Sequence, residues 1–233
     1  MEDSVAMSRG VTGNVLRDGF LRDITALTLG LVRARGNSMY LGPFELLRFG
    51  RAAVTETRVD WPIEGGLAVR ASGGRFRIEA LGGRLVASVH GYQPRLPLPL
   101  YGLTQLPIHH LLTRLHLLRV RGRQPAPGMP AVPTRRLAAA AIDLGLCAAL
   151  AATSGRRLRL PVLVGIAAGY HVACWSLSGR TLGGVLMRQR VVAVDGSRAS
   201  AGQAVVRLAG LPVSALRLRA IHDELAGTDV VAD

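Results

Sequence analysis

The sequence predicts a chain of two parts: a soluble α+β domain over residues 1–124, with helices and a small antiparallel β meander, and an α-helical membrane domain over residues 135–233. Three observations predict this fold class. Two apolar stretches, 137–155 and 160–178, are separated only by a basic tetrapeptide. Apolar and polar residues alternate between glycine pairs in the first half. Residues 125–134 are rich in proline, which is typical of a linker.

The two apolar stretches predict a transmembrane hairpin with spans at about 137–155 and 160–178. Each would form roughly 28 Å of helix, close to the hydrocarbon thickness of a bilayer. Asp143 lies near the centre of the first stretch, where a carboxylate costs roughly 2.5–3.5 kcal/mol. We therefore expect Asp143 to face a protein partner or a hydrated cavity, as a functional group or as a buried residue held by neighbouring hydroxyls.

The charge of the chain indicates its partner. The net charge is +14, and all 29 basic residues are arginines. Such a surface attracts either nucleic acid or an anionic membrane face. Because the chain contains two apparent spans and no basic motif interleaved with aromatic residues, we expect a lipid bilayer and no nucleic acid. Arginines flank both outer ends of the hairpin, which predicts cytoplasmic termini.

In the first domain we expect residues 14–50 to be mainly helical, because Leu16, Phe20 and Ile24 recur at helical spacing. Strands are expected over 54–63 and in the alternating segments that follow. The glycine pairs between these segments are typical of hairpin turns. They are not a phosphate loop, because they lack the Lys-Ser/Thr end of that motif.

Histidine and cysteine give no sign of a metal or cofactor site. His109 and His116 lie two helical turns apart in the leucine-rich segment 103–123, too far for one ion, so we interpret them as polar-face residues. Cys147 and Cys174 would lie at different depths of the hairpin, so we expect two packing residues and no disulfide. With no catalytic signature either, we expect no enzyme activity, no cofactor and no metal.

A polar set can be assembled around Asp143. Arg136 precedes it by two helical turns on the same face, about 10 Å away in rise. His171 would lie at the same depth on the second span, where it could share a proton with Asp143. The alternative is a His171 hydrogen-bonded to the backbone.

Four segments resemble the RDD family of bacterial membrane proteins, over about residues 134–231. They are Arg135–Asp143 (RRLAAAAID), Gly179–Gly183 (GRTLG), Arg190–Gly196 (RVVAVDG) and Ile221–Val231 (IHDELAGTDVV). The family is named for one arginine and two aspartates, which Arg136, Asp143 and Asp223 match in this sequence. Residues 1–124 lie outside the resemblance.

The resemblance implies a multi-pass protein of the bacterial cytoplasmic membrane, for which transport of ions or small ligands is the usual suggestion. The match departs from the family at residues 199–216, where Arg207 and Pro212 interrupt what would be a third span. We expect an interfacial or re-entrant helix there. Because two spans cannot enclose a pathway, a transporter made of this chain would have to be a homo-oligomer.

Two functions remain open from the sequence. The first is a membrane protein that binds or transports an ion or small polar solute as an oligomer through Arg136, Asp143 and Asp223, with His171. The second is a membrane-anchored scaffold whose N-terminal domain binds a cytoplasmic partner.

Overall fold

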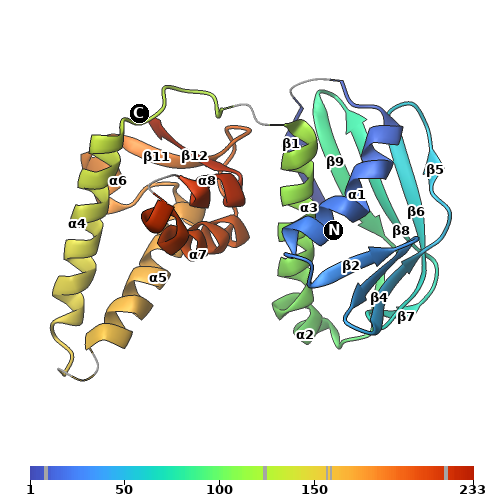
Figure 1. Cartoon of the computed structure of the whole chain (residues 1–233), viewed down its shortest axis with the longest axis horizontal. Coiled ribbons are helices and arrows are strands. Elements are labelled where there is room, and N and C mark those ends of the chain that lie inside the picture. The colour runs from blue at the N-terminus through green and yellow to red at the C-terminus, as the bar shows by residue number, and fades with distance from the viewer. Residues whose placement is uncertain (8–9, 123–124, 156, 158, 218–219) are drawn as a thin grey trace. The chain divides into compact units, whose positions relative to one another are not determined.

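The computed structural model describes residues 1–7, 10–122, 125–155, 157, 159–217 and 220–233 (Figure 1). The chain divides into two compact units, Met1–Gln124 and Pro125–Asp233. The division falls where the proline-rich segment begins. The two units are described separately below.

Unit 1 is built on a curled antiparallel sheet. Its strands run in the order β1-β9-β8-β6-β4-β3-β2, and β5 pairs with β6 off this path. Strand β1 thus pairs with β9, the last strand of this sheet in the chain, while most of the other strands pair with one that is close to them in the sequence. The strands of the sheet are β1 (Glu2–Ala6), β2 (Val32–Arg35), β3 (Ser38–Leu41), β4 (Phe44–Phe49), β5 (Ala53–Val54), β6 (Arg58–Gly65), β8 (Gly74–Leu81) and β9 (Arg84–His90). A separate pair is formed by β7 (Val69–Ala71) and β10 (Gln93–Pro94).

Helices α1 (Gly13–Leu27) and α3 (Gln105–Arg121) pack against each other and against the sheet, and the short α2 (Leu98–Leu103) precedes α3 (Figure 1). Helix α1 buries Leu16, Phe20 and Ile24 at intervals of four residues, the pattern of an amphipathic helix. The helices therefore supply the apolar layer that covers the concave side of the sheet.

An aromatic cluster forms the centre of unit 1. Trp61 of β6 and Phe76 of β8 are register partners whose rings stack with centroids 5.6 Å apart. Phe20 of α1 lies 5.3 Å from Trp61 and 4.6 Å from Phe76, and Phe49 of β4 contacts all three. Such ring pairs stabilise a core beyond their area burial, so these residues fix the helix on the sheet.

The expectation that residues 14–50 are mainly helical is wrong beyond Leu27. The chain there forms strands β2, β3 and β4. Gly36 and Gly42 adopt φ of 57° and 59°, a left-handed conformation that suits tight turns between antiparallel strands. Local helical spacing was misleading because the apolar residues of these strands are selected by pairing with distant partners.

In its described residues, unit 2 combines helices with a two-stranded antiparallel sheet whose strands are separated in the chain by two of the helices. Strands β11 (Gln189–Ala193) and β12 (Thr228–Ala232) pair antiparallel. The helices are α4 (Pro133–Ala151), α5 (Arg159–Leu177), α6 (Leu182–Leu186), α7 (Ala201–Arg217) and α8 (Ile221–Ala226). The segment expected to be a linker is held to β12: the Ala131 amide donates to Val230 at 2.9 Å, and the Ala126 amide donates to Asp229 at 2.9 Å.

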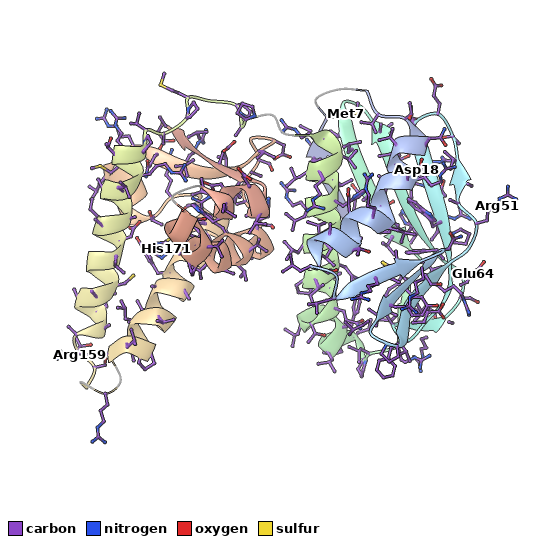
Figure 2. The ribbon with its side chains drawn as sticks, in the orientation of Figure 1. Met7, Asp18, Arg51, Glu64, Arg159 and His171 are labelled. Atoms are coloured by element: carbon purple, nitrogen blue, oxygen red, sulfur yellow. The ribbon has the colours of Figure 1, made fainter. Side chains whose placement is uncertain are left out.

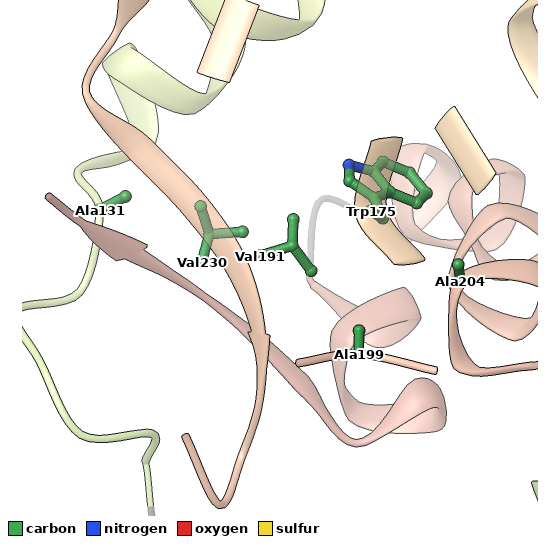
Figure 3. Packing of buried hydrophobic residues seen from close by; sticks show 6 residues of the cluster. All are labelled: Ala131, Trp175, Val191, Ala199, Ala204 and Val230. Carbon is green, nitrogen blue, oxygen red and sulfur yellow. The ribbon is translucent and has the colours of Figure 1, made fainter. Parts of the chain in front are cut away.

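A core of unit 2 lies between the β11–β12 sheet, α5 and α7. Trp175 of α5 packs with Val191 of β11, Val230 of β12 and Ala204 of α7 (Figure 3). Most of the buried residues around the Trp175 ring are alanines and valines, so the helices and the two-stranded sheet approach it closely. This packing holds β11, β12 and α7 against the C-terminal end of α5.

The expected two-span membrane hairpin is wrong. Helices α4 and α5 do lie next to each other, but of the helices in the described ranges only α5 is long and apolar enough to cross a membrane. Helix α4 carries charged residues and buries Ala139, Asp143, Cys147 and Ala151 against the rest of the unit. The packed face of α4 thus includes the carboxylate of Asp143, while Ala140, Ala141, Ala148 and Ala149 of the same helix are exposed. Two residues of the tetrapeptide, Arg156 and Leu158, lie outside the described residues.

The expected interfacial or re-entrant helix over 199–216 is a packed helix of unit 2. Helix α7 contacts α5 and α8, and it buries Gln203, Ala204 and Arg207. Pro212 is accommodated inside it. The charge of Arg207, which argued against a third span, instead has partners within the protein.

Candidate functional site

Arg136 and Asp223 form an ion pair in unit 2. Arg136 near the start of α4 donates from Nη2 to Asp223 Oδ2 of α8 at 2.5 Å. The Asp223 side chain is only 6% exposed. The structure thus brings together two of the proposed site residues that are 87 positions apart in the sequence.

Asp223 is also paired with Arg207 of α7, and Thr228 joins the same group. The Asp223 Oδ1 atom contacts Arg207 and accepts from the Thr228 hydroxyl at 3.0 Å. The Arg207 guanidinium lies 4.9 Å from the ring of Trp175 and donates to Thr228 at 3.0 Å. Because both carboxylate oxygens are engaged by side chains of this unit, the geometry gives Asp223 a role in clamping α4, α7 and α8.

His222 and Ser214 adjoin this cluster. The Ser214 hydroxyl lies 2.8 Å from His222 Nδ1 and donates to Gly210 at 3.0 Å. Burial, together with the charges of Arg207 and Arg136, lowers the pKa of His222 to about 4. Serine, histidine and aspartate are the residue types of a hydrolase triad, but a histidine with this pKa is a weak base at neutral pH, and Asp223 is already occupied by arginines.

Asp143 has different partners from those expected. Its Oδ1 atom accepts from the Tyr170 hydroxyl at 2.9 Å and from the Gly183 amide at 2.8 Å. The Leu182 amide in turn donates to the Tyr170 hydroxyl at 2.7 Å. Asp143 therefore satisfies amide groups at the first turn of α6, where a negative charge is favourable. The sequence alternative of a buried carboxylate held by a neighbouring hydroxyl describes this arrangement.

His171 does not contact Asp143. Its Nδ1 atom lies 2.8 Å from the Ala167 carbonyl, one turn earlier in α5. Its ring is close to those of Tyr170 and Trp175, with centroids 5.2 and 4.9 Å away. Figure 2 labels His171 on α5, and Arg159 at the far end of the same helix. The proton-sharing pair is thus replaced by a pair formed by the adjacent tyrosine.

Cys147 and Cys174 are both free thiols in the structure, as expected. Among the described residues no group of histidine, cysteine and carboxylate side chains has the arrangement of a metal site. Binding of an ion or solute by the set Arg136, Asp143, His171 and Asp223 stays a prediction.

Unit 1 contains a site that the sequence did not indicate. A pocket of about 100 Å³ opens between the concave face of the sheet and helices α1 and α3. Its wall is formed by apolar side chains from seven elements and by four polar side chains, three of which, Tyr92, Tyr101 and His109, lie together at one corner. The lining residues are Met1, Phe20, Ile24, Met39, Leu47, Phe49, Ile63, Phe76, Val89, Tyr92, Tyr101, His109, Leu112 and Thr113.

The three histidines of the leucine-rich helix have separate environments, and one of them is not on a polar face. His116 is completely buried, with Nδ1 3.0 Å from Asp23 of α1. His110 lies 2.9 Å from Asp3 of β1. His109 lines the pocket. Two of the histidines therefore join α3 to other elements, and the third is available to a ligand.

Sequence reasoning missed the pocket because no local signal marks it. Its lining residues come from α1, β3, β4, β6, β8, β9, α2 and α3. Each is an ordinary core residue by type. The nearest signal is the short segment with Tyr92 and Tyr101, two of only four tyrosines in the chain.

Comparison with known proteins finds no match: no protein-family model, no curated protein and no solved structure is significantly similar to the chain. The resemblance to the RDD family stays a prediction that rests on its motifs. Arguments about function therefore rest on the geometry of the two units.

Proposed function

We propose that the chain is a binding protein whose unit 1 takes up a small, mainly apolar molecule in the pocket between its sheet and helices α1 and α3. The observation that carries the proposal is the apolar lining of this pocket. Water is held poorly in such a space because each molecule needs two to four polar partners.

The size of the pocket limits the ligand. Apolar cavities of about 150 Å³ in other proteins bind benzene, and this pocket of about 100 Å³ is open on one side. One ring or a short branched chain matches that space. Burying roughly 150–200 Å² of ring surface at about 25 cal/mol per Å² gives about 4–5 kcal/mol, which corresponds to a Kd of roughly 0.2–1 mM.

The test uses the full chain and toluene as the probe, with binding measured by calorimetry or by ligand-observed NMR. Leu47→Trp fills the pocket from β4 and should weaken toluene binding by at least about tenfold. Leu46→Trp is the matched control, because successive side chains of a strand point to opposite faces and Leu46 does not line the pocket. Undetectable binding to the wild type, or equal binding by both variants, would overturn the proposal.

A second function is favoured by one observation on unit 2. Helix α5 buries only Trp175, and Leu160, Val164 and Leu177 are 60–71% exposed on it. Arg159 lies exposed at the beginning of the same helix (Figure 2), and Arg157, which precedes the helix, is also exposed. We infer that α5 attaches unit 2 to an anionic lipid surface, with apolar side chains in the acyl region and arginines at the headgroups.

Flotation with vesicles containing phosphatidylserine tests the attachment. Leu160→Asp should reduce the bound fraction several-fold, because a carboxylate is placed among acyl chains. Leu103→Asp is the control, since Leu103 is a similarly exposed leucine of α2 in unit 1. If the wild type stays unbound, or if both variants lose binding alike, the attachment through α5 is refuted.

A further inference from the structure

The polar corner of the pocket consists of three rings in mutual contact. Tyr92 follows β9, Tyr101 lies on α2 and His109 lies on α3. Their centroids are 5.8 to 6.0 Å apart in every pair. A molecule in the pocket would thus meet aliphatic and phenyl surface on most sides and hydrogen-bonding groups on one.

The two tyrosine hydroxyls differ in their availability. The Tyr92 hydroxyl donates to the Ala68 carbonyl at 2.8 Å, a short bond that uses its only proton. The Tyr101 hydroxyl lies 3.4 Å from His109 Nδ1, at the outer limit for a hydrogen bond. A ligand group could replace that long contact without loss of a good bond, so Tyr101 and His109 can exchange their mutual contact for a bond to a ligand, whereas the Tyr92 hydroxyl can offer a ligand only its oxygen as an acceptor.

The pocket is suited to a neutral ligand. Burial lowers the pKa of His109, and the charge of His110 lowers it further, so the imidazole is neutral at pH 7. Among the described residues that line the pocket there is no arginine, aspartate or glutamate, and the ammonium group of Met1 there already donates to the Val89 carbonyl at 3.3 Å. An ionised head group bound at Tyr101 and His109 would therefore lose water and gain only neutral hydrogen-bonding partners at that corner, which is costly.

We propose that the pocket selects a neutral, ring-sized molecule with a single hydroxyl group, of the phenol class, whose hydroxyl bonds to Tyr101 and His109. This inference rests on the proposed function of unit 1 and specifies its ligand. An apolar pocket without such partners would prefer a hydrocarbon, because moving an unpaired hydroxyl out of water is unfavourable. Phenol and toluene have nearly the same shape, so the ratio of their Kd values reports the polar corner alone.

The experiment measures the binding of phenol, toluene and benzoate to the full chain by calorimetry at pH 7. The wild type should bind phenol at least as tightly as toluene, and benzoate at least about tenfold more weakly than phenol. Tyr101→Phe should weaken phenol binding roughly three- to tenfold while toluene binding is unchanged. Tyr40→Phe is the matched control: it also removes a tyrosine hydroxyl, but one that donates to Glu45 and belongs to no lining residue, so the ratio for phenol and toluene should stay at the wild-type value.

The outcomes separate the two proposals. If toluene binds and phenol binds more weakly to both the wild type and Tyr101→Phe, the ligand class is wrong while the apolar pocket is supported. If Tyr40→Phe changes the ratio as much as Tyr101→Phe does, the assignment of the hydroxyl contact is overturned. If none of the three molecules binds, the proposed function itself fails.

Discussion

Replacement of Asp223 by asparagine should destabilise unit 2 strongly. The Asp223 and Arg207 side chains are 6% and 5% exposed, so Asp223→Asn leaves the buried guanidinium without the carboxylate that contacts it, and of its counter-charges the charge of Asp229 is retained. Breaking a buried ion pair in this way costs about 3–5 kcal/mol of unfolding free energy. Arg136, which is 29% exposed, can regain water and adds less to the cost.

The two tryptophans make the measurement specific to one unit. Trp61 lies in the core of unit 1 and Trp175 in that of unit 2. With Trp61→Phe as the background, urea unfolding followed by fluorescence reports Trp175 alone. A loss of about 4 kcal/mol would lower the midpoint by about 2 M for an m-value near 2 kcal/mol per M.

Two further variants test the reasoning. Asp233→Asn removes a carboxylate that pairs with the half-exposed Arg180 and Arg190, and it should cost less than about 1 kcal/mol. Adding Arg207→Met to Asp223→Asn should restore part of the lost stability, because the unpaired charge is removed. An Asp223→Asn variant as stable as the Asp233→Asn control, or a double variant less stable than Asp223→Asn alone, would refute the clamp.

Three other predictions concern unit 2. Gly183→Ala should disrupt the packing of α6 on α4, because a Cβ at this position would lie 2.2 Å from the Ala139 carbonyl oxygen. Its control is Gly145→Ala on the exposed side of α4, which should leave the stability unchanged or raise it by up to about 1 kcal/mol. Thermal melts followed by circular dichroism compare the two variants. Asp143→Ala should cost about 1–3 kcal/mol in urea unfolding, because it strands the Gly183 amide, and an unchanged midpoint would contradict this capping role. The pKa of His222 is lowered from 6.5 to about 4, so between these pH values the unfolded protein binds more protons at this residue than the folded protein does. The contribution of His222 to the free energy of unfolding is therefore full above pH 6.5 and is lost as the pH falls towards 4. His222→Asn should reduce this decline in urea titrations at a series of pH values.

Some elements could be predicted from local patterns and others could not. The strands β8 and β9 follow from alternation around Gly82-Gly83, because hairpin partners are adjacent in the chain. The strands β2 and β3 were misread because their pairing with β4 leaves only short local patterns. For α4, length and composition predicted a span, but burial of Asp143 and Cys147 depends on the contacts of α4 with α5 and α6.

The sequence by itself determined the net charge, the two apolar helices α4 and α5, and the presence of a carboxylate, Asp143, within the first of them. These features depend on composition or on single segments of the chain. Only the tertiary structure decided which distant residues are in contact. It pairs Arg136 with Asp223 and Asp143 with the start of α6, and it brings together the residues that line the pocket. A hydrogen-bond partner that is a backbone amide leaves no mark in residue types. A pocket is not marked in the sequence either. It is a volume left between several elements, and most of its lining residues are of the same types as those in any hydrophobic core.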